Sequence, residues 1–192
     1  MQSNKILSII AIGHWNRRIF TPTWIKNVVL ELPEDKEVQG ILNMEDMDWG
    51  FKYEKITVLP KNASIEIKIE GEDEKDIIYG TKILNKILQN LSHTPIKALG
   101  FNVICNFNIS ETNPLLEAVK KSNVGFGNFK LHQTTHLLQA NNYTIRILSS
   151  TESLGFKVNF NFQYIGKPPL FDDDIFVTHI KQIDKILENG NI

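Results

Sequence analysis

The feature that most constrains the fold of this chain is an internal repeat pattern, in which similar segments recur 92 residues apart, as from position 5 to position 97. The matched pairs are Lys5–Leu7 with Lys97–Leu99, Trp15 with Phe107, Pro22 with Pro114 and, after the offset drifts, Leu84–Asn90 with Ile183–Asn189. A repeat of this length predicts a duplicated half-domain rather than a solenoid unit. We therefore expect two half-repeats, 1–92 and 93–192, that form one compact domain about a pseudo-twofold axis.

Two segments show the alternation that is typical of strands with one buried face. Isoleucines at 65, 67 and 69 alternate with charged residues at 66, 68 and 70, and the aromatic and aliphatic residues of 156–164 alternate with Lys157, Asn159, Asn161 and Gln163. Because successive side chains point to opposite faces of a strand, each segment has one core face and one polar face.

The same order of elements is predicted in both halves: a strand, a helix, three strands and a helix. The predicted ranges are 6–12, 22–30, 38–44, 53–59, 64–70 and 72–91, then 96–107, 114–121, 129–138, 143–148, 156–164 and 172–189. The predicted fold class is α+β: an internally duplicated β-α-β-β-β-α unit that builds an antiparallel sheet with helices packed on one face.

Composition narrows the class of protein. The 192 residues carry a formal net charge of −1, which argues against a dedicated nucleic-acid binder because such proteins need a strong positive field. The one cysteine, Cys105, excludes an intrachain disulfide. No apolar stretch approaches the roughly 20 residues that a membrane-spanning helix needs. We expect a cytoplasmic protein without membrane contact.

The residues with catalytic or metal-binding potential do not form a recognisable set. His132 and His136 have a helical zinc spacing, but in a strand they stand about 13 Å apart. Cys105 lies in a predicted apolar strand, which favours a structural role for its thiol over a catalytic one. Acidic residues at 45, 46 and 48 lack the calcium-loop pattern. We expect no metal and no cofactor, and although enzymatic activity stays open, a non-enzymatic role is favoured.

Two groups of residues are candidates for contact with a partner. Trp49 lies with Met44 and Met47 in a predicted hairpin loop, where such side chains can anchor an interface, although Trp49 can equally fold back onto the core. Lys157, Asn159 and Asn161 belong to the polar sheet face, for which simple solvation is the alternative. Five basic residues lie near turns and can converge on a phosphate or remain solvated: Arg17, Arg18, Lys120, Lys121 and Lys130.

Three functions follow from these patterns. The leading hypothesis is a non-enzymatic protein that acts through protein–protein contacts, as a homo-oligomer or as a subunit of a larger assembly. The alternative is a small-molecule sensor or carrier with its ligand between the two halves, near Trp15 and Phe107. The third is nucleic-acid binding by the polar sheet face.

The duplicated order of elements resembles the TATA-binding-protein-like and helix-grip group of folds. That resemblance implies a curved antiparallel sheet with helices on one side, and fold alone implies no function. TATA-binding proteins use a basic saddle with intercalating phenylalanines, whereas this chain has a net negative charge. Separately, the segment 94–102, Thr-Pro-Ile-Lys-Ala-Leu-Gly-Phe-Asn, is similar to one in a sporadically distributed, uncharacterised bacterial family.

Overall fold

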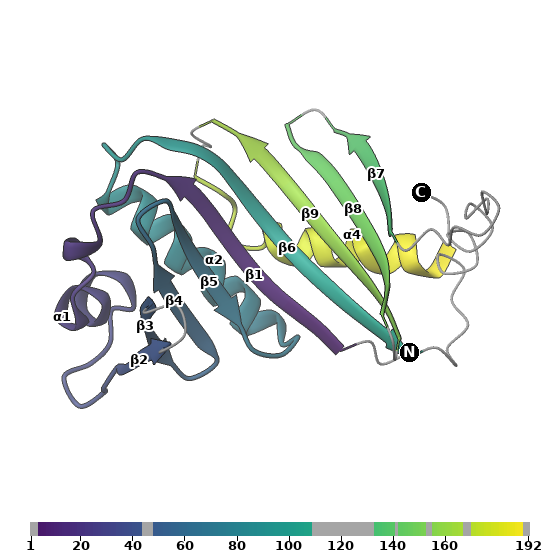
Figure 1. Cartoon of the computed structure of the whole chain (residues 1–192). Coiled ribbons are helices and arrows are strands. Elements are labelled where there is room, and N and C mark those ends of the chain that lie inside the picture. The colour runs from purple at the N-terminus through teal and green to yellow at the C-terminus, as the bar shows by residue number, and fades with distance from the viewer. Residues whose placement is uncertain are drawn as a thin grey trace.

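A computed structural model describes residues 4–43, 48–108, 133–140, 142–152, 155–166 and 170–189. The strands in this part of the chain are β1 (Asn4–Gly13), β2 (Gln39–Asn43), β3 (Asp48–Tyr53), β4 (Ile56–Pro60), β5 (Ser64–Ile69), β6 (Ile96–Asn108), β7 (Gln133–Gln139), β8 (Thr144–Glu152) and β9 (Gly155–Ile165). They form one antiparallel sheet in the order β2-β3-β4-β5-β1-β6-β9-β8-β7 (Figure 1). The predicted α+β class with an antiparallel sheet is confirmed.

Two long helices cover one face of this sheet. Helix α2 (Glu74–Asn90) and helix α4 (Ile175–Asn189) both lie behind the strands in Figure 1. Asp73 caps α2 by accepting a hydrogen bond from the Lys75 backbone N–H, and acidic residues in the first turn suit the positive end of the helix dipole. The apolar faces of both helices meet the buried side of the sheet in one hydrophobic core.

The centre of the core lies where β1 pairs with β6. Ile9 stands opposite Phe101, and both side chains are fully buried. These two residues are 92 positions apart in the sequence, which is the offset between the matched segments of the repeat. Moreover, β5, β4 and β3 follow outward from β1 as β9, β8 and β7 follow outward from β6. A duplicated unit predicts this register and order, and the duplication itself stays a prediction.

The first half contains one strand more than predicted. The segment predicted as a single strand over 53–59 is divided by a turn in which Glu54 adopts a positive φ of 51°. Strand β3 ends at Tyr53 and β4 begins at Ile56, so four strands, not three, separate the helical segments. The extra strand is β3, which occupies residues that were predicted as a hairpin loop, and the turn at Glu54 was missed because no glycine or proline marks it.

The predicted first helix is short and irregular. A 3₁₀ turn, η1 (Arg17–Ile19), is followed by α1 (Pro22–Trp24), which runs directly into a π-helical turn, η2 (Ile25–Val29). The corresponding helix predicted over 114–121 lies outside the described residues. In the second half, β8 and β9 extend beyond the predicted ranges, and β7 is described only from Gln133.

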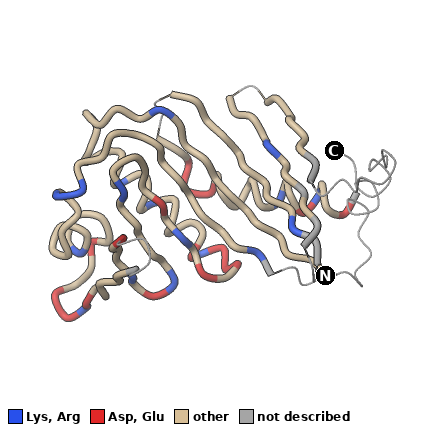
Figure 2. Tube along the Cα trace, viewed as in Figure 1, with Lys and Arg blue, Asp and Glu red and all other residues tan. Residues whose placement is uncertain are grey.

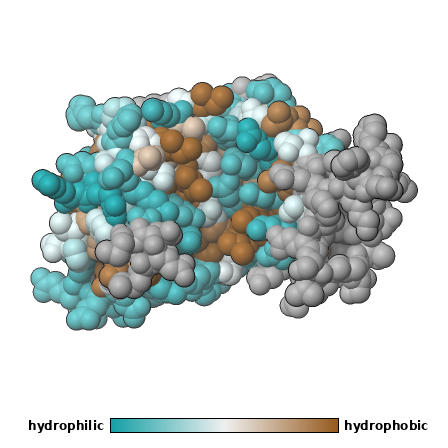
Figure 3. Space-filling view, in the orientation of Figure 1, coloured by the Kyte–Doolittle hydropathy of each residue, from teal (hydrophilic) through white to brown (hydrophobic). Residues whose placement is uncertain are grey.

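The sheet face opposite the helices is open in the described part of the molecule. Figure 2 shows that β1, β6 and β9 carry few charged residues, and Figure 3, from the same side, shows apolar patches among hydrophilic ones. Ile6 and Ile12 of β1 lie on this face and are 50% and 44% exposed. The predicted solvated polar face is therefore a mixed surface with exposed isoleucines at its centre.

A candidate apolar binding hollow

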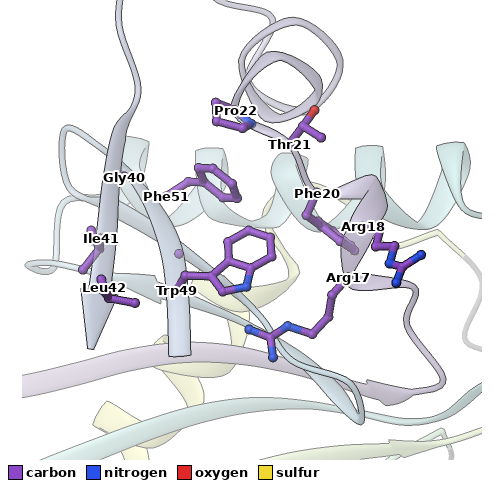
Figure 4. A pocket seen from close by; sticks show the side chains of 11 residues that line it. Arg17, Arg18, Phe20, Thr21, Pro22, Gly40, Ile41, Leu42, Trp49 and Phe51 are labelled. Atoms are coloured by element: carbon purple, nitrogen blue, oxygen red, sulfur yellow. The ribbon is translucent and has the colours of Figure 1, made fainter. Parts of the chain in front are cut away.

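The candidate site is a mainly apolar hollow at the β2 end of the sheet, on the side that the helices cover. It lies between the segment 17–22 and the end strands β2 and β3 (Figure 4), and its volume is about 460 Å³. Ligand pockets typically enclose about 300–1,000 Å³. Its apolar lining consists chiefly of Phe20, Pro22, Ile41, Leu42, Trp49 and Phe51, with Arg17 and Arg18 at the edge. We call this feature the Trp49 hollow.

One wall of the Trp49 hollow is built by a chain segment that turns twice. The Asn16 side chain accepts a hydrogen bond from the Arg18 N–H, and the Thr21 hydroxyl accepts one from the Trp24 N–H. These caps start η1 and α1, and Pro22 suits the first turn of α1 because that position needs no N–H. The turns bury Phe20, whose ring lies edge-on to Trp24 at 5.2 Å.

The floor of the hollow is built by alternate residues of β3. Trp49 and Phe51 point to the same side of the sheet, and their ring centroids are 5.2 Å apart at 85°. Between them, a side chain at Gly50 would meet Val58 O at 2.8 Å and Leu59 Cδ2 at 2.4 Å, so glycine is required where β3 lies against β4. Trp49 therefore lies in a strand, and the predicted hairpin loop at this position was wrong.

Leu42 forms the outer lip of the hollow. It stands opposite Trp49 in the β2–β3 pairing and is 57% exposed. Strand β2 is the last strand of the sheet, and no backbone hydrogen bond joins its outer side to another described segment. The hollow therefore borders a strand edge whose outward N–H and C=O groups lack a described partner.

Charged residues gather at the inner edge of the hollow. The Arg17 guanidinium lies over the Trp49 ring, with Cζ 5.2 Å from the ring centroid, a cation–π geometry. Its Nη2 is 3.7 Å from Asp48 Oδ1, and Lys61 Nζ is 3.1 Å from Asp48 Oδ2. In Figure 4, Arg17 reaches beneath the indole, whereas Arg18 points away from it.

The predicted contact residues fall into separate places. Trp49 lines the hollow, while Met44 and Met47 lie outside the described residues. Lys157, Asn159 and Asn161 are on the open face of β9, opposite Asn106, Ile104 and Asn102 of β6. The hollow and this polar face therefore belong to different halves of the sheet and to its opposite sides.

The open face contains one buried amide that the sequence did not single out, Asn102, beside the predicted contact residue Asn161. Asn102 is only 8% exposed, and its Nδ2 donates to no described acceptor. The neighbouring Asn161 Oδ1 is likewise shielded and unpaired, and it leans toward the space beside Gly100, where an added Cβ would lie 3.2 Å from it. This amide group is polar and lies apart from the Trp49 hollow.

Trp15 and Phe107 do not line a shared groove. They are 5% and 4% exposed, and the Trp15 indole N–H donates to Ala11 O at 3.1 Å. Trp15 follows Gly13, which pairs with Ile96 at one end of the β1–β6 ladder, whereas Phe107 follows Asn106 at the other end. About ten residues of strand, or about 30 Å, separate the two side chains. Their equivalent positions in the repeat put the two side chains at opposite ends of the ladder rather than next to each other.

Burial disfavours the charged forms of two titratable side chains in the core, His179 and Cys105. Burial lowers the pKa of His179 to about 4 and raises the pKa of the Cys105 thiol to about 12. His179 stacks on Phe162 with centroids 4.0 Å apart, and its Nε2 is hydrogen-bonded to the Tyr164 hydroxyl. A nucleophilic cysteine needs the opposite shift, so Cys105 has the character of a structural thiol.

The described residues contain no cluster of three or more histidine, cysteine or acidic side chains placed to hold a metal ion. None of the described helices is long and apolar enough to cross a bilayer.

No protein-family model matches the chain, and no curated protein matches it. The class that the fold and the site define is thus an α+β sheet protein with an apolar hollow beside an end strand.

Proposed function

We propose that this protein is a protein-binding module, and that a segment of a partner protein inserts an apolar side chain into the Trp49 hollow. The observation that carries the proposal is the continuity of the hollow with the unpaired outer edge of β2. A partner segment that crosses the lip at Leu42 reaches an aromatic floor and an open strand edge at once. Both features are typical of surfaces that receive extended protein segments.

The composition of the hollow supports an interface anchor. Interface hot spots concentrate in a few aromatic side chains and arginines around well-packed apolar pockets, with other contacts contributing little. Here Trp49 and Arg17 lie face to face, and Phe20 and Phe51 provide a rigid floor because both are almost fully buried. An exposed leucine at the lip adds apolar area that a partner removes from water.

A segment of a protein fits this site better than a compact metabolite. The hollow is open toward solvent rather than enclosed. Metabolite pockets usually bury most of the ligand surface, and an open hollow leaves much of a small ligand in water. Binding of small organic ligands is therefore tested as a competing outcome below.

The proposal is tested by selecting ligands from a random-peptide display library and measuring their affinities calorimetrically. We expect Leu42→Asp to weaken binding about thirtyfold, the effect of losing a hot spot of about 2 kcal/mol. The matched control is Leu137→Asp, because Leu137 is a similarly exposed leucine (63% against 57%) on the opposite end strand, β7. Equal affinities of the two variants would contradict the proposal.

A further inference from the structure

Arg17 has hydrogen-bonding capacity that the described protein does not use. Its Nε and Nη2 atoms are shielded from solvent, yet neither donates a hydrogen bond to a described acceptor. The nearest carboxylate oxygen, Asp48 Oδ1, is 3.7 Å from Nη2, which is beyond hydrogen-bond range. A guanidinium with unmet N–H groups is costly to keep, so an acceptor supplied from outside would stabilise it.

The charges around Arg17 leave a local positive excess. Asp48 is shared with Lys61 at 3.1 Å, and Arg18 also borders the hollow. Among the described residues, Arg17 and Lys61 both lie near the single carboxylate of Asp48, so the described charges at this edge sum to +1 in a chain whose formal charge is −1. The inner edge of the Trp49 hollow is thus electrostatically complementary to an anion.

The proposed partner, a protein segment, narrows the kind of anion. The cation–π contact with Trp49 holds the Arg17 guanidinium beside the apolar floor, and its forked N–H groups suit a carboxylate or a phosphate. Of these two anions, the carboxylate is the one that the side chains of an unmodified protein segment supply. An occupant that satisfies both features has an apolar body in the hollow and a carboxylate at its inner edge.

We propose that the partner segment presents an acidic side chain next to its apolar anchor, and that Arg17 binds this carboxylate. This inference rests on the proposed function and adds the chemistry of the partner. In this proposal the carboxylate is the side chain of an internal aspartate or glutamate of the segment. An aromatic anchor suits the volume of about 460 Å³ and the edges of the Trp49 and Phe51 rings.

The test compares two blocked peptides, acetyl-Gly-Phe-Glu-Gly-amide and acetyl-Gly-Phe-Gln-Gly-amide, by NMR titration of the full chain. Their binding is followed at the Trp49 indole N–H. We expect the glutamate peptide to bind about tenfold tighter, since a hydrogen bond to a charged acceptor is stronger than one to an amide. Arg17→Gln should reduce this ratio to below about twofold, whereas the control variant Arg18→Gln should retain it.

Each outcome decides a different point. Equal binding of both peptides, with shifts at Trp49, would overturn the carboxylate inference and leave the proposed hollow intact. Binding of neither peptide would overturn both. If 3-phenylpropionate binds and the blocked glutamate peptide does not, the anion belongs to a small molecule and the inference about a protein segment fails. Native-like spectra of both arginine variants establish that the fold is retained.

Discussion

The two halves of the sheet differ in the lengths of their strands. In the first half, β5 spans Ser64–Ile69 and β4 spans Ile56–Pro60, whereas their second-half counterparts β9 and β8 are the longer segments Gly155–Ile165 and Thr144–Glu152. Within the described residues, the first half also contains the end strand β2 and a helical segment, with the Trp49 hollow between them. The described part of the molecule therefore has short strands and the hollow at one end of the sheet, and long strands over α4 at the other (Figure 1).

The aromatic residues are also distributed unequally between the two halves. All three tryptophans, at 15, 24 and 49, lie in the first half. The second half instead gathers Tyr164, Phe171, Phe176 and His179 around Phe101, with their ring centroids between 5.1 and 6.0 Å from that of Phe101. We infer that the second half provides the stable body of the protein and the first half carries the contact site.

The largest expected effect comes from Phe101→Ala. Phe101 is fully buried at the centre of this aromatic group, so its truncation should lower the free energy of unfolding by about 3–5 kcal/mol. Because all tryptophans lie in the other half, their fluorescence should report the same shift in denaturant midpoint as far-UV circular dichroism. If the denaturant midpoint measured by tryptophan fluorescence stays at its wild-type value, the two halves unfold independently. That result would contradict a shared core.

The second effect is confined to the second half and depends on pH. Burial lowers the pKa of His179 from about 6.5 to about 4, so between these pH values the unfolded chain binds the proton more readily. Stability should be constant above about pH 7 with respect to this group and fall by about 3 kcal/mol as the pH drops to about 4.

The control for this prediction is His179→Phe, which keeps an aromatic ring against Phe162 and removes the titration. Urea unfolding at a series of pH values measures both proteins. The wild type should lose more stability on acidification than the variant, and parallel pH profiles would show that His179 does not carry the effect.

The smallest expected effect concerns the joint between the halves. The Asn85 side chain on α2 donates to Phe171 O at 2.8 Å and accepts from the Phe171 N–H at 3.1 Å. Asn85→Ala leaves both backbone groups without this partner and should cost about 1–3 kcal/mol. Asn90→Ala, at the exposed end of the same helix, is the control, and equal changes in thermal stability would show that the Asn85 contacts contribute nothing specific.

The sequence predicted much of the fold because its signals were local. The alternation of Ile65, Ile67 and Ile69, and the aromatic alternation of 156–164, set the buried faces of β5 and β9 directly. The helical periodicity of α2 and α4 was equally clear. The turn at Glu54 was missed because its residue carries no turn signature, although its φ is positive.

The site was predictable only in part, since it depends on contacts between distant segments. Trp49 was singled out as a large apolar residue among acidic ones, and Arg17 as a basic residue at a turn. No local pattern indicates that the segment 17–22 lies across from 40–42, or that Phe20 lies under the hollow. Trp15 and Phe107 do not form the predicted groove. Residues at equivalent positions of a repeat are related by symmetry and need not lie close together.

The central claim is that the partner binds at the Trp49 hollow and not on the open face of the second half. The most direct measurement is an NMR titration of the full chain with the tightest selected peptide, observed at the three tryptophan indoles and the side-chain amides. The account predicts that the Trp49 indole signal moves most and that Trp15, hydrogen-bonded to Ala11 O inside the core, stays in place. Shifts concentrated on the amides of Asn102, Asn159 and Asn161, with Trp49 unchanged, would contradict it.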